Sequence, residues 1–178
     1  MDKKWTVVDA LRHSRHDWLN RLQLVKSHLS LGGVDRVHEL IEEFVGEAQQ
    51  EARLINLKMP LFAELLLTYS WNSPPCELDF EVLGEEQLPL THLDQPLTTW
   101  TEQFLYLLHR SLDHHIENHL SVTVEQEAEE TKIYFDFRGK LLDTHAIESW
   151  LTKCKEEQNN FIYSMQPEEI CIEMQLIE

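Results

Sequence analysis

A repeating apolar stripe near the start of the chain constrains the fold more than any other feature of the sequence. Apolar side chains recur there in alternating three- and four-residue steps, at Val8, Leu11, Trp18, Leu22, Val25 and Leu29. A seven-residue repeat of this kind forms the seam of a helix that packs in a bundle. We therefore predict a helix over residues 6–31, with Arg15 as a polar layer within the stripe.

A second helix is predicted directly after the first. Gly32 and Gly33 stop the first helix and allow a tight reversal. Residues 34–55 then repeat the three-four spacing of apolar side chains, so the pair should form an antiparallel helical hairpin. Two helices leave one side of their seam uncovered, and we predict a homodimer in which two hairpins form a four-helix bundle. The alternative is that the downstream part of the chain covers the seam.

His16 lies beside the stripe, one step round the helix from Arg15, and should face outwards. A neutral imidazole is a nucleophile near pH 7, and arginine and amide side chains can hold phosphate oxygens. An outward histidine with such neighbours is typical of phosphoryl transfer onto a protein side chain. We predict His16 as the catalytic residue. The predicted phosphate and partner contacts are Arg12, Arg15, Asp17, Asn20 and Arg21. One helical step is a poor angle for a direct contact from Asp17 to the His16 ring.

The residues alone leave two other histidine sites open, an alternative phosphoryl carrier and a metal pair. His13 has a similar exposed position and could carry the phosphoryl group instead. His115 and His119 are spaced as one helical turn at the end of a predicted helix, near His109 and His114. Such a pair can bind a metal, but no cysteine or acid completes a recognisable spacing. We therefore predict a solvated helix face and no metal site.

The segment from residue 13 to residue 24, HSRHDWLNRLQL, closely resembles the segment around the phosphorylated histidine of the sporulation initiation phosphotransferase B family, from the phosphorelay of endospore-forming bacteria. Shorter similar stretches span nearly the whole chain, at residues 35–37, 41–43, 54–58, 80–85, 117–120, 136–137 and 170–173. The resemblance implies that the phosphorylated residue is His16, directly before Asp17 and Trp18. It also implies two response regulators as partners, a single-domain donor and a DNA-binding acceptor that controls sporulation.

Residues 58–178 are predicted to form a second domain after a helical first domain of residues 1–57. Helices are expected near residues 61–67, 97–118 and 144–158, and strands near 76–82, 120–124, 133–137 and 170–177. This pattern predicts an α/β sandwich, and an α+β fold class for the whole chain. The order of parts resembles that of sensor histidine kinases. However, Gly84 and Gly139 are the only glycines of this part, and they form no phosphate-binding loop. We expect a degenerate ATP-binding domain without a nucleotide site, in which Glu117 and Asn118 are at most a remnant.

Charge and cysteine content narrow the function classes. Residues 1–31 carry six Lys or Arg against three Asp, a net charge of +3. The rest of the chain therefore has a net charge of −20, which gives −17 for the whole sequence. A nucleic-acid binder would have a dominant basic face, so we predict no nucleic-acid partner. The basic first helix could steer an acidic protein surface towards it, or the acidity could serve solubility alone. The sequence shows no apolar run of membrane-spanning length, no signal peptide and no paired cysteines, which predicts a cytoplasmic protein.

The predicted reaction moves a phosphoryl group from an aspartate of one regulator to His16, and from His16 to an aspartate of the second. Such a transfer needs in-line approach and charge neutralisation. The acidic pocket of the regulator can supply Mg²⁺, so the chain needs no cofactor of its own. The spacing His-Asp-x-x-Asn is similar to that of histidine kinases that also dephosphorylate their partners. The alternative function is a non-catalytic dimeric scaffold that binds and sequesters a response regulator.

Overall fold

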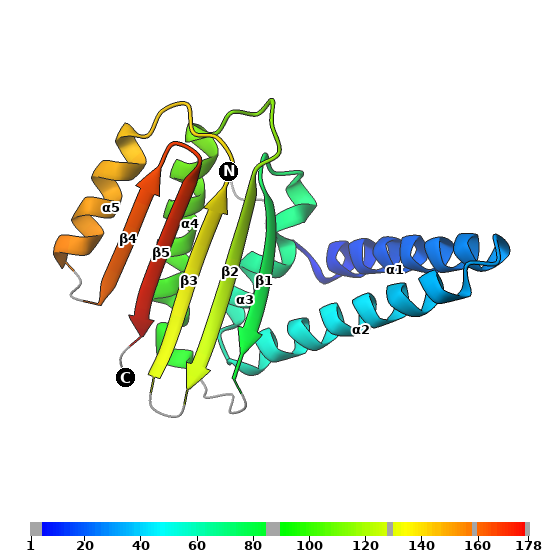
Figure 1. The fold of residues 1–178 in the computed structure, drawn as a ribbon. Helices are drawn as coiled ribbons and strands as arrows, with labels where there is room; N and C mark the ends of the chain where they lie inside the picture. The colour runs from blue at the N-terminus through cyan, green and yellow to red at the C-terminus, as the bar shows by residue number, and fades with distance from the viewer. Residues whose placement is uncertain (1–4, 85–89, 128–129, 158–159, 177–178) are drawn as a thin grey trace. The chain divides into compact units, whose positions relative to one another are not determined.

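The computed structural model describes residues 5–84, 90–127, 130–157 and 160–176 (Figure 1). The chain divides into two compact units, Met1–Gln49 and Gln50–Glu178. The second helix runs through this boundary, so it contributes to both units. The domain boundary expected between residues 57 and 58 stays a prediction. Parts of three predicted elements lie outside the described residues, namely Gln158, Ile177 and the turn at residues 128–129.

The first unit is the expected helical hairpin. Helix α1 spans Val7–Ser30 and α2 spans Val34–Asn56, within two residues of the predicted bounds. Thr6 begins α1 with a capping box, because its hydroxyl accepts the Asp9 N–H and its own N–H donates to the Asp9 carboxylate, both at 3.2 Å. Gly32 reverses the chain at φ +77°, which a residue with a β-carbon rarely adopts. The predicted antiparallel hairpin is therefore confirmed.

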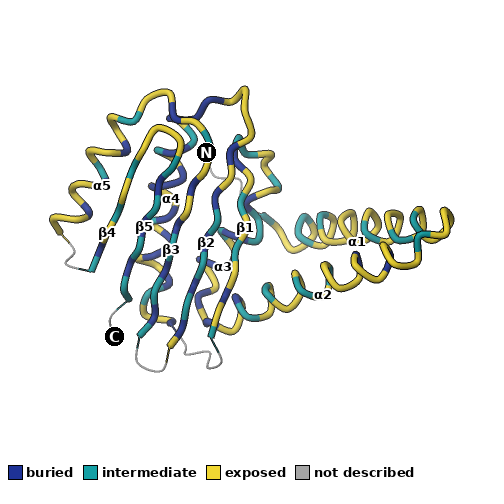
Figure 2. The backbone as a smooth tube through the Cα atoms, in the orientation of Figure 1, coloured by how far each residue is buried: buried dark blue, intermediate teal, exposed yellow. Residues whose placement is uncertain are grey.

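The apolar stripe of α1 stays open to solvent in this structure. No residue of α1 is buried, and the side chains of Leu11 and Leu22 are 65% and 58% exposed. Helix α2 buries only Val37 and Leu40 near the turn within the first unit. Figure 2 shows both helices coloured mostly as exposed. One hairpin therefore does not bury its own seam.

The second unit is a five-stranded mixed sheet with helices packed on one of its faces (Figure 1). The strand order is β1-β2-β3-β5-β4, in which β1 and β2 are parallel and the other neighbours are antiparallel. The helical elements are α3 (Pro60–Thr68), α4 (Asp94–Ser111), α5 (His145–Glu157) and two short 3-10 helices, Tyr69–Asn72 and Thr91–Leu93. The strands are β1 (Glu77–Leu83), β2 (His119–Glu127), β3 (Glu130–Arg138), β4 (Phe161–Gln166) and β5 (Glu169–Leu176). Together with the hairpin, this architecture confirms the α+β class.

The core lies between the sheet and its helices. Strands β2, β3 and β5 alternate buried and less buried residues, as expected for a sheet covered on one face. Phe104 of α4 and Phe135 of β3 are fully buried, with ring centroids 5.7 Å apart. Trp100 stacks on Phe104 at 5.5 Å. This aromatic cluster joins α4 to the middle of the sheet.

Three side chains of α4 and α2 pair backbone groups of α3 and β1. Asp94, at the start of α4, accepts the backbone N–H groups of Leu61 and Phe62 and so caps α3, whose own cap residue supplies no side-chain hydrogen bond. On the outer side of β1, the Gln50 amide oxygen accepts the Val82 N–H at 2.8 Å. Arg53 donates to the carbonyl oxygen of the same residue at 3.1 Å. Near the end of β1, the backbone groups of Val82 are therefore paired by side chains of α2.

Two sequence predictions for the second unit are wrong. Helix α4 ends at Ser111 and not near residue 118, because Leu112 is extended (φ −74°, ψ 147°) and pairs with Leu141. His119 consequently begins β2 and does not follow His115 on a helix. The sequence analysis also missed β4, a six-residue strand that pairs with β5.

Asn118 organises the segment between α4 and β2. Its side chain is buried, and its Nδ2 donates to the carbonyl oxygens of Asp113 at 2.9 Å and Ile116 at 3.1 Å. Its Oδ1 accepts the Lys140 N–H at 3.1 Å. A β-carbon at Gly139 would lie 2.3 Å from this oxygen, so the adjoining turn requires glycine. Asn118 has a structural role here.

We expect Asn118→Ala to lower the free energy of unfolding by about 2–4 kcal/mol, because buried backbone groups lose their partners. Urea denaturation followed by circular dichroism measures this change. The matched control is Asn72→Ala, an exposed asparagine at the end of a 3-10 helix, which should change stability by less than about 0.5 kcal/mol. Equal effects of the two substitutions would contradict the role of Asn118.

Candidate functional site

His16 lies near the middle of α1 with its side chain 71% exposed. The capping box fixes the start of the helix, and the helical hydrogen bonds fix the backbone on both sides of the histidine. The expectation that His16 faces outwards is therefore confirmed for the single chain. A partner can approach the ring from solvent.

Two polar neighbours contact the same nitrogen of this ring. Asp17 Oδ1 lies 3.3 Å from His16 Nδ1, and Asn20 Nδ2 lies 3.2 Å from it. The Asp17 contact corrects the expectation that one helical step is a poor angle for it. Among the described residues, both contacts of the ring involve Nδ1. The Nε2 atom is thus the one available to an incoming phosphorus.

The three arginines predicted to contact phosphate have different surroundings in the structure. Arg12 is paired with Asp9, one turn earlier, at 3.2 Å. Arg21 donates to Glu47 of α2 at 2.6 Å, and its guanidinium lies 5.1 Å from the Phe44 ring centroid. Arg21 therefore joins the two helices and is not gathered with His16. Arg15 is exposed beside His16 on α1.

His13, the alternative carrier, has different surroundings from His16. Its ring packs edge-on against the Trp5 ring, with centroids 5.2 Å apart, and the residue is half-buried. The packing restricts approach to one side of the ring. His16 is consequently the more accessible of the two histidines.

The histidines of the second unit do not assemble a metal site. His109 is on α4, His114 and His115 are in the following loop, and His119 starts β2 with its Nε2 3.6 Å from Asp79. In the described parts of the chain, no three His, Cys, Asp or Glu side chains are placed to hold one ion.

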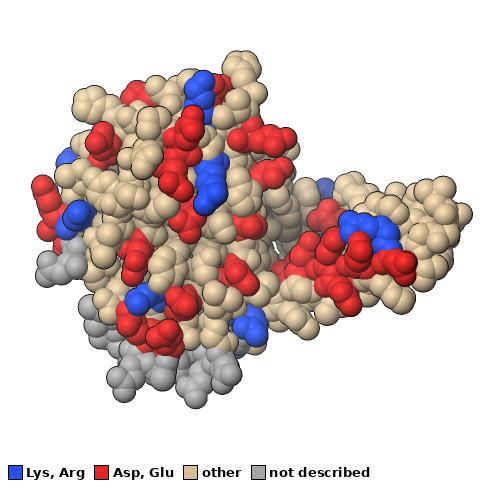
Figure 3. All heavy atoms as spheres, viewed as in Figure 1, with Lys and Arg blue, Asp and Glu red and all other residues tan. Residues whose placement is uncertain are grey.

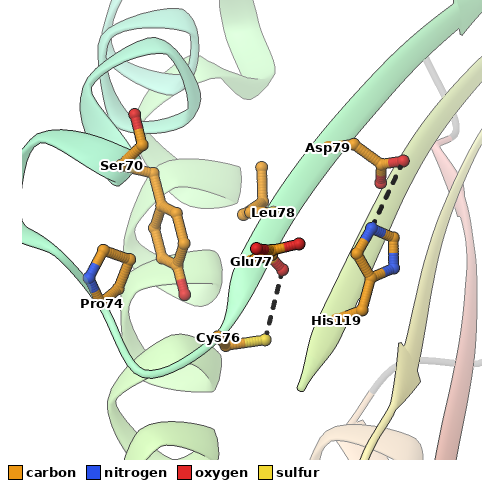
Figure 4. Close-up of a pocket in the computed structure, with 8 residues that line it drawn as sticks. Ser70, Pro74, Cys76, Glu77, Leu78, Asp79 and His119 are labelled. Carbon is orange, nitrogen blue, oxygen red and sulfur yellow. Dashed lines mark hydrogen bonds and ion pairs between the residues drawn. The ribbon is translucent and has the colours of Figure 1, made fainter. Parts of the chain in front are cut away.

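A hollow of about 320 Å³ lies beside the start of β1, and sequence reasoning did not find it. Its lining includes Tyr69, Cys76, Glu77, Asp79 and His119 (Figure 4). Burial raises the pKa of the Cys76 thiol to about 12, so this thiol is not a nucleophile near neutral pH. Two carboxylates at the opening disfavour a phosphate ligand. This hollow does not offer a second phosphoryl-transfer site.

The hydroxyl of Tyr69, which lines this hollow, is 2.7 Å from Nε2 of His109. Burial, and secondarily the charge of His114, lower the pKa of His109 below its ordinary value. The folded protein therefore favours the neutral imidazole at this position.

Comparisons with known proteins now bear on the identity of the chain. The family model described as "Sensor_kinase_SpoOB-type, alpha-helical domain" matches residues 1–57. The model "Sporulation initiation phospho-transferase B, C-terminal" matches residues 58–177. Sporulation initiation phosphotransferase B of Bacillus subtilis (strain 168) is 36% identical over 172 residues, which cover 96% of this chain and 89% of that protein.

The chain belongs to the sporulation initiation phosphotransferase B family. This membership confirms the resemblance stated from the segment around His16. It also confirms a phosphotransferase of the sporulation phosphorelay as the class of enzyme. The role of each site residue stays a prediction.

The solved structures that match this chain have lower sequence identity to it. The catalytic domain of histidine kinase ThkA is 11% identical and matches with a TM-score of 0.44, over 70% of this chain and 92% of that one. Acinetobacter baumannii histidine kinase AdeS is 9% identical with a TM-score of 0.41, over 91% of this chain and 97% of that one. TM-scores this low do not by themselves establish a shared fold. Within the described residues, no helix has the length and apolar character needed to cross a bilayer.

We expect the stability of the protein to fall as the pH drops from about 7.5 to about 5, and His109 to account for part of this loss. The unfolded chain binds a proton at this histidine near pH 6.5, while the folded chain binds it only at lower pH. Stability from this group is thus complete above pH 6.5 and is lost as the pH falls. In His109→Gln, urea denaturation should show a weaker pH dependence. The exposed control His92→Gln should keep the wild-type dependence, and an unchanged profile in His109→Gln would refute the assignment.

Proposed function

We propose that this chain accepts a phosphoryl group from a phospho-aspartate of a single-domain response regulator onto His16. It then passes the group to an aspartate of a second, DNA-binding response regulator that controls sporulation. The observation that carries this proposal is the exposed His16 ring, whose two polar contacts both lie at Nδ1 and leave Nε2 for attack. Family membership supports the phosphotransferase class.

The chemistry requires little from the chain beyond position and charge. The lone pair of His16 Nε2 forms a bond to phosphorus, the P–O bond of the acyl phosphate breaks, and the aspartate leaves as a carboxylate. Arg15, Arg12 and the Asn20 amide lie on the same stretch of helix and can neutralise or hold phosphoryl oxygens. The regulator supplies Mg²⁺ from its own acidic pocket. The phosphoramidate product keeps a high transfer potential, so the onward step is reversible.

The proposed active form is a homodimer. Five apolar side chains of the α1 stripe are each more than half exposed, namely Val8, Leu11, Trp18, Leu22 and Leu29. Together they form a contiguous exposed apolar surface, whereas ordinary surfaces carry single scattered apolar residues. A second hairpin of the same sequence presents a matching stripe, and two hairpins about a twofold axis make a four-helix bundle. Each dimer then offers two equivalent His16 rings beside the seam.

The second unit supports the interpretation that the protein accepts phosphoryl groups from a partner and does not take them from ATP as a kinase does. It lacks the spaced glycines with which backbone amides approach phosphates. On the face of the second unit drawn in Figure 3, Asp and Glu cover more of the surface than Lys and Arg, which argues against a nucleic-acid partner and a membrane partner. We expect the protein to act in the cytoplasm. A scaffold that only sequesters a regulator is not favoured, since the family is one of phosphotransferases.

Incubation with a radioactively phosphorylated single-domain response regulator tests the carrier. Wild-type protein should take up acid-labile, base-stable label. His16→Ala should fold, because the side chain is exposed, yet take up none. His13→Ala is the matched control and should still be labelled. Arg15→Ala should slow transfer about 10- to 100-fold without moving the label, as loss of a charged contact does. Label that persists in His16→Ala and vanishes in His13→Ala would assign the carrier to His13.

Light scattering at micromolar concentration tests the dimer. Wild-type protein should have twice the mass of one chain. Leu22→Glu places a charge on the stripe, at a side chain 58% exposed in the single chain, and should yield monomers. Leu24→Glu places the same charge on the other side of α1 and should remain dimeric. A wild-type protein that is monomeric under these conditions would exclude the bundle.

A further inference from the structure

The ring of His16 has two neighbours that require opposite proton states of the same atom. The Asn20 amide nitrogen, 3.2 Å from Nδ1, is a donor and needs a bare nitrogen. The Asp17 carboxylate, 3.3 Å from Nδ1, is an acceptor and needs an N–H there. Neutral imidazole carries one N–H, so the two hydrogen bonds exclude each other.

The choice between these neighbours decides whether His16 can react. When Asn20 donates to Nδ1, the ring proton is on Nε2, and Nε2 has no lone pair for phosphorus. When Nδ1–H donates to Asp17, the lone pair is on Nε2, which faces away from both neighbours. The tautomer of the ring therefore sets the fraction of His16 that is a competent nucleophile.

We propose that Asn20 is a positioning residue that restrains His16 in the unreactive tautomer, in competition with Asp17. This inference rests on the proposed function of His16 as phosphoryl carrier. The side chains of His16 and Asp17 are 71% and 56% exposed, so neither hydrogen bond is strong. The two tautomers are close in free energy, and a modest change in contacts can reverse their order.

An arriving phosphoryl group supplies that change. Its oxygens are better acceptors for the Asn20 amide than a neutral ring nitrogen. Once the amide turns to these oxygens, Nδ1 takes the ring proton and donates it to Asp17. The Nε2 lone pair then forms the N–P bond, the acyl P–O bond breaks, and the Nδ1 proton stays on the ring beside Asp17. The substrate itself would thus release the restraint.

Nitrogen-15 NMR of histidine-labelled protein measures the tautomer directly. At about pH 8.5, where histidine rings are generally neutral, the shifts of Nδ1 and Nε2 report which atom carries the proton. Asn20→Ala should raise the ratio of the Nδ1–H to the Nε2–H tautomer of His16 about two- to tenfold. Asp17→Ala should lower it. Gln23→Ala, an exposed amide two turns from His16, should leave it unchanged, and the His13 signals serve as an internal reference.

An unchanged or opposite tautomer shift in Asn20→Ala would overturn the proposed restraint. The carrier assignment fails on a different result, namely label from a regulator that persists in His16→Ala.

Discussion

The apolar stripe of α1 is the constraint on which the rest of the molecule depends. A single hairpin leaves it exposed, and the cost of exposed apolar area rises with every residue of the stripe. The same helix must keep the opposite shoulder polar for His16, Asp17 and Asn20. The apolar seam and the polar residues around His16 thus lie on different sides of one helix. In the proposed dimer, packing along the seam would hold the helix and keep the histidine facing a partner.

Local and periodic features could be predicted from the sequence, and long-range polar contacts could not. The hairpin, its glycine reversal and the exposure of His16 follow from seven-residue spacing, and the structure has them. The end of α4 was missed because its decisive partner, Leu141, lies far along the chain from Leu112. Strand β4 was missed although Phe161, Ile162 and Tyr163 favour strands, because the run is only six residues long and its pairing with β5 is not a local signal. The Asp94 cap of α3 also depends on a fold that no local pattern reveals.

At the candidate site, the sequence analysis named the residues but not their arrangement. Asp17 and Asn20 do meet His16, yet both meet the same nitrogen. Arg21 was assigned to phosphate, whereas the structure uses it to join α1 and α2 through Glu47. Spacing along a helix defines which side chains can meet, while rotamers and the neighbouring helix decide which do. Asn118 shows the same principle in the second unit, where a polar side chain holds three backbone groups of a turn.

The pairing of β1 by Gln50 and Arg53 has a consequence for how the chain can be divided. Strand edges with free N–H and C=O groups add strands from other molecules, and at Val82 this edge is closed by side chains from the last turns of α2. A fragment that begins after residue 57 keeps every strand of the sheet but lacks this closure. Such a fragment presents β1 as an open template for self-association. The last turns of α2 thereby also protect the sheet that follows them from self-association.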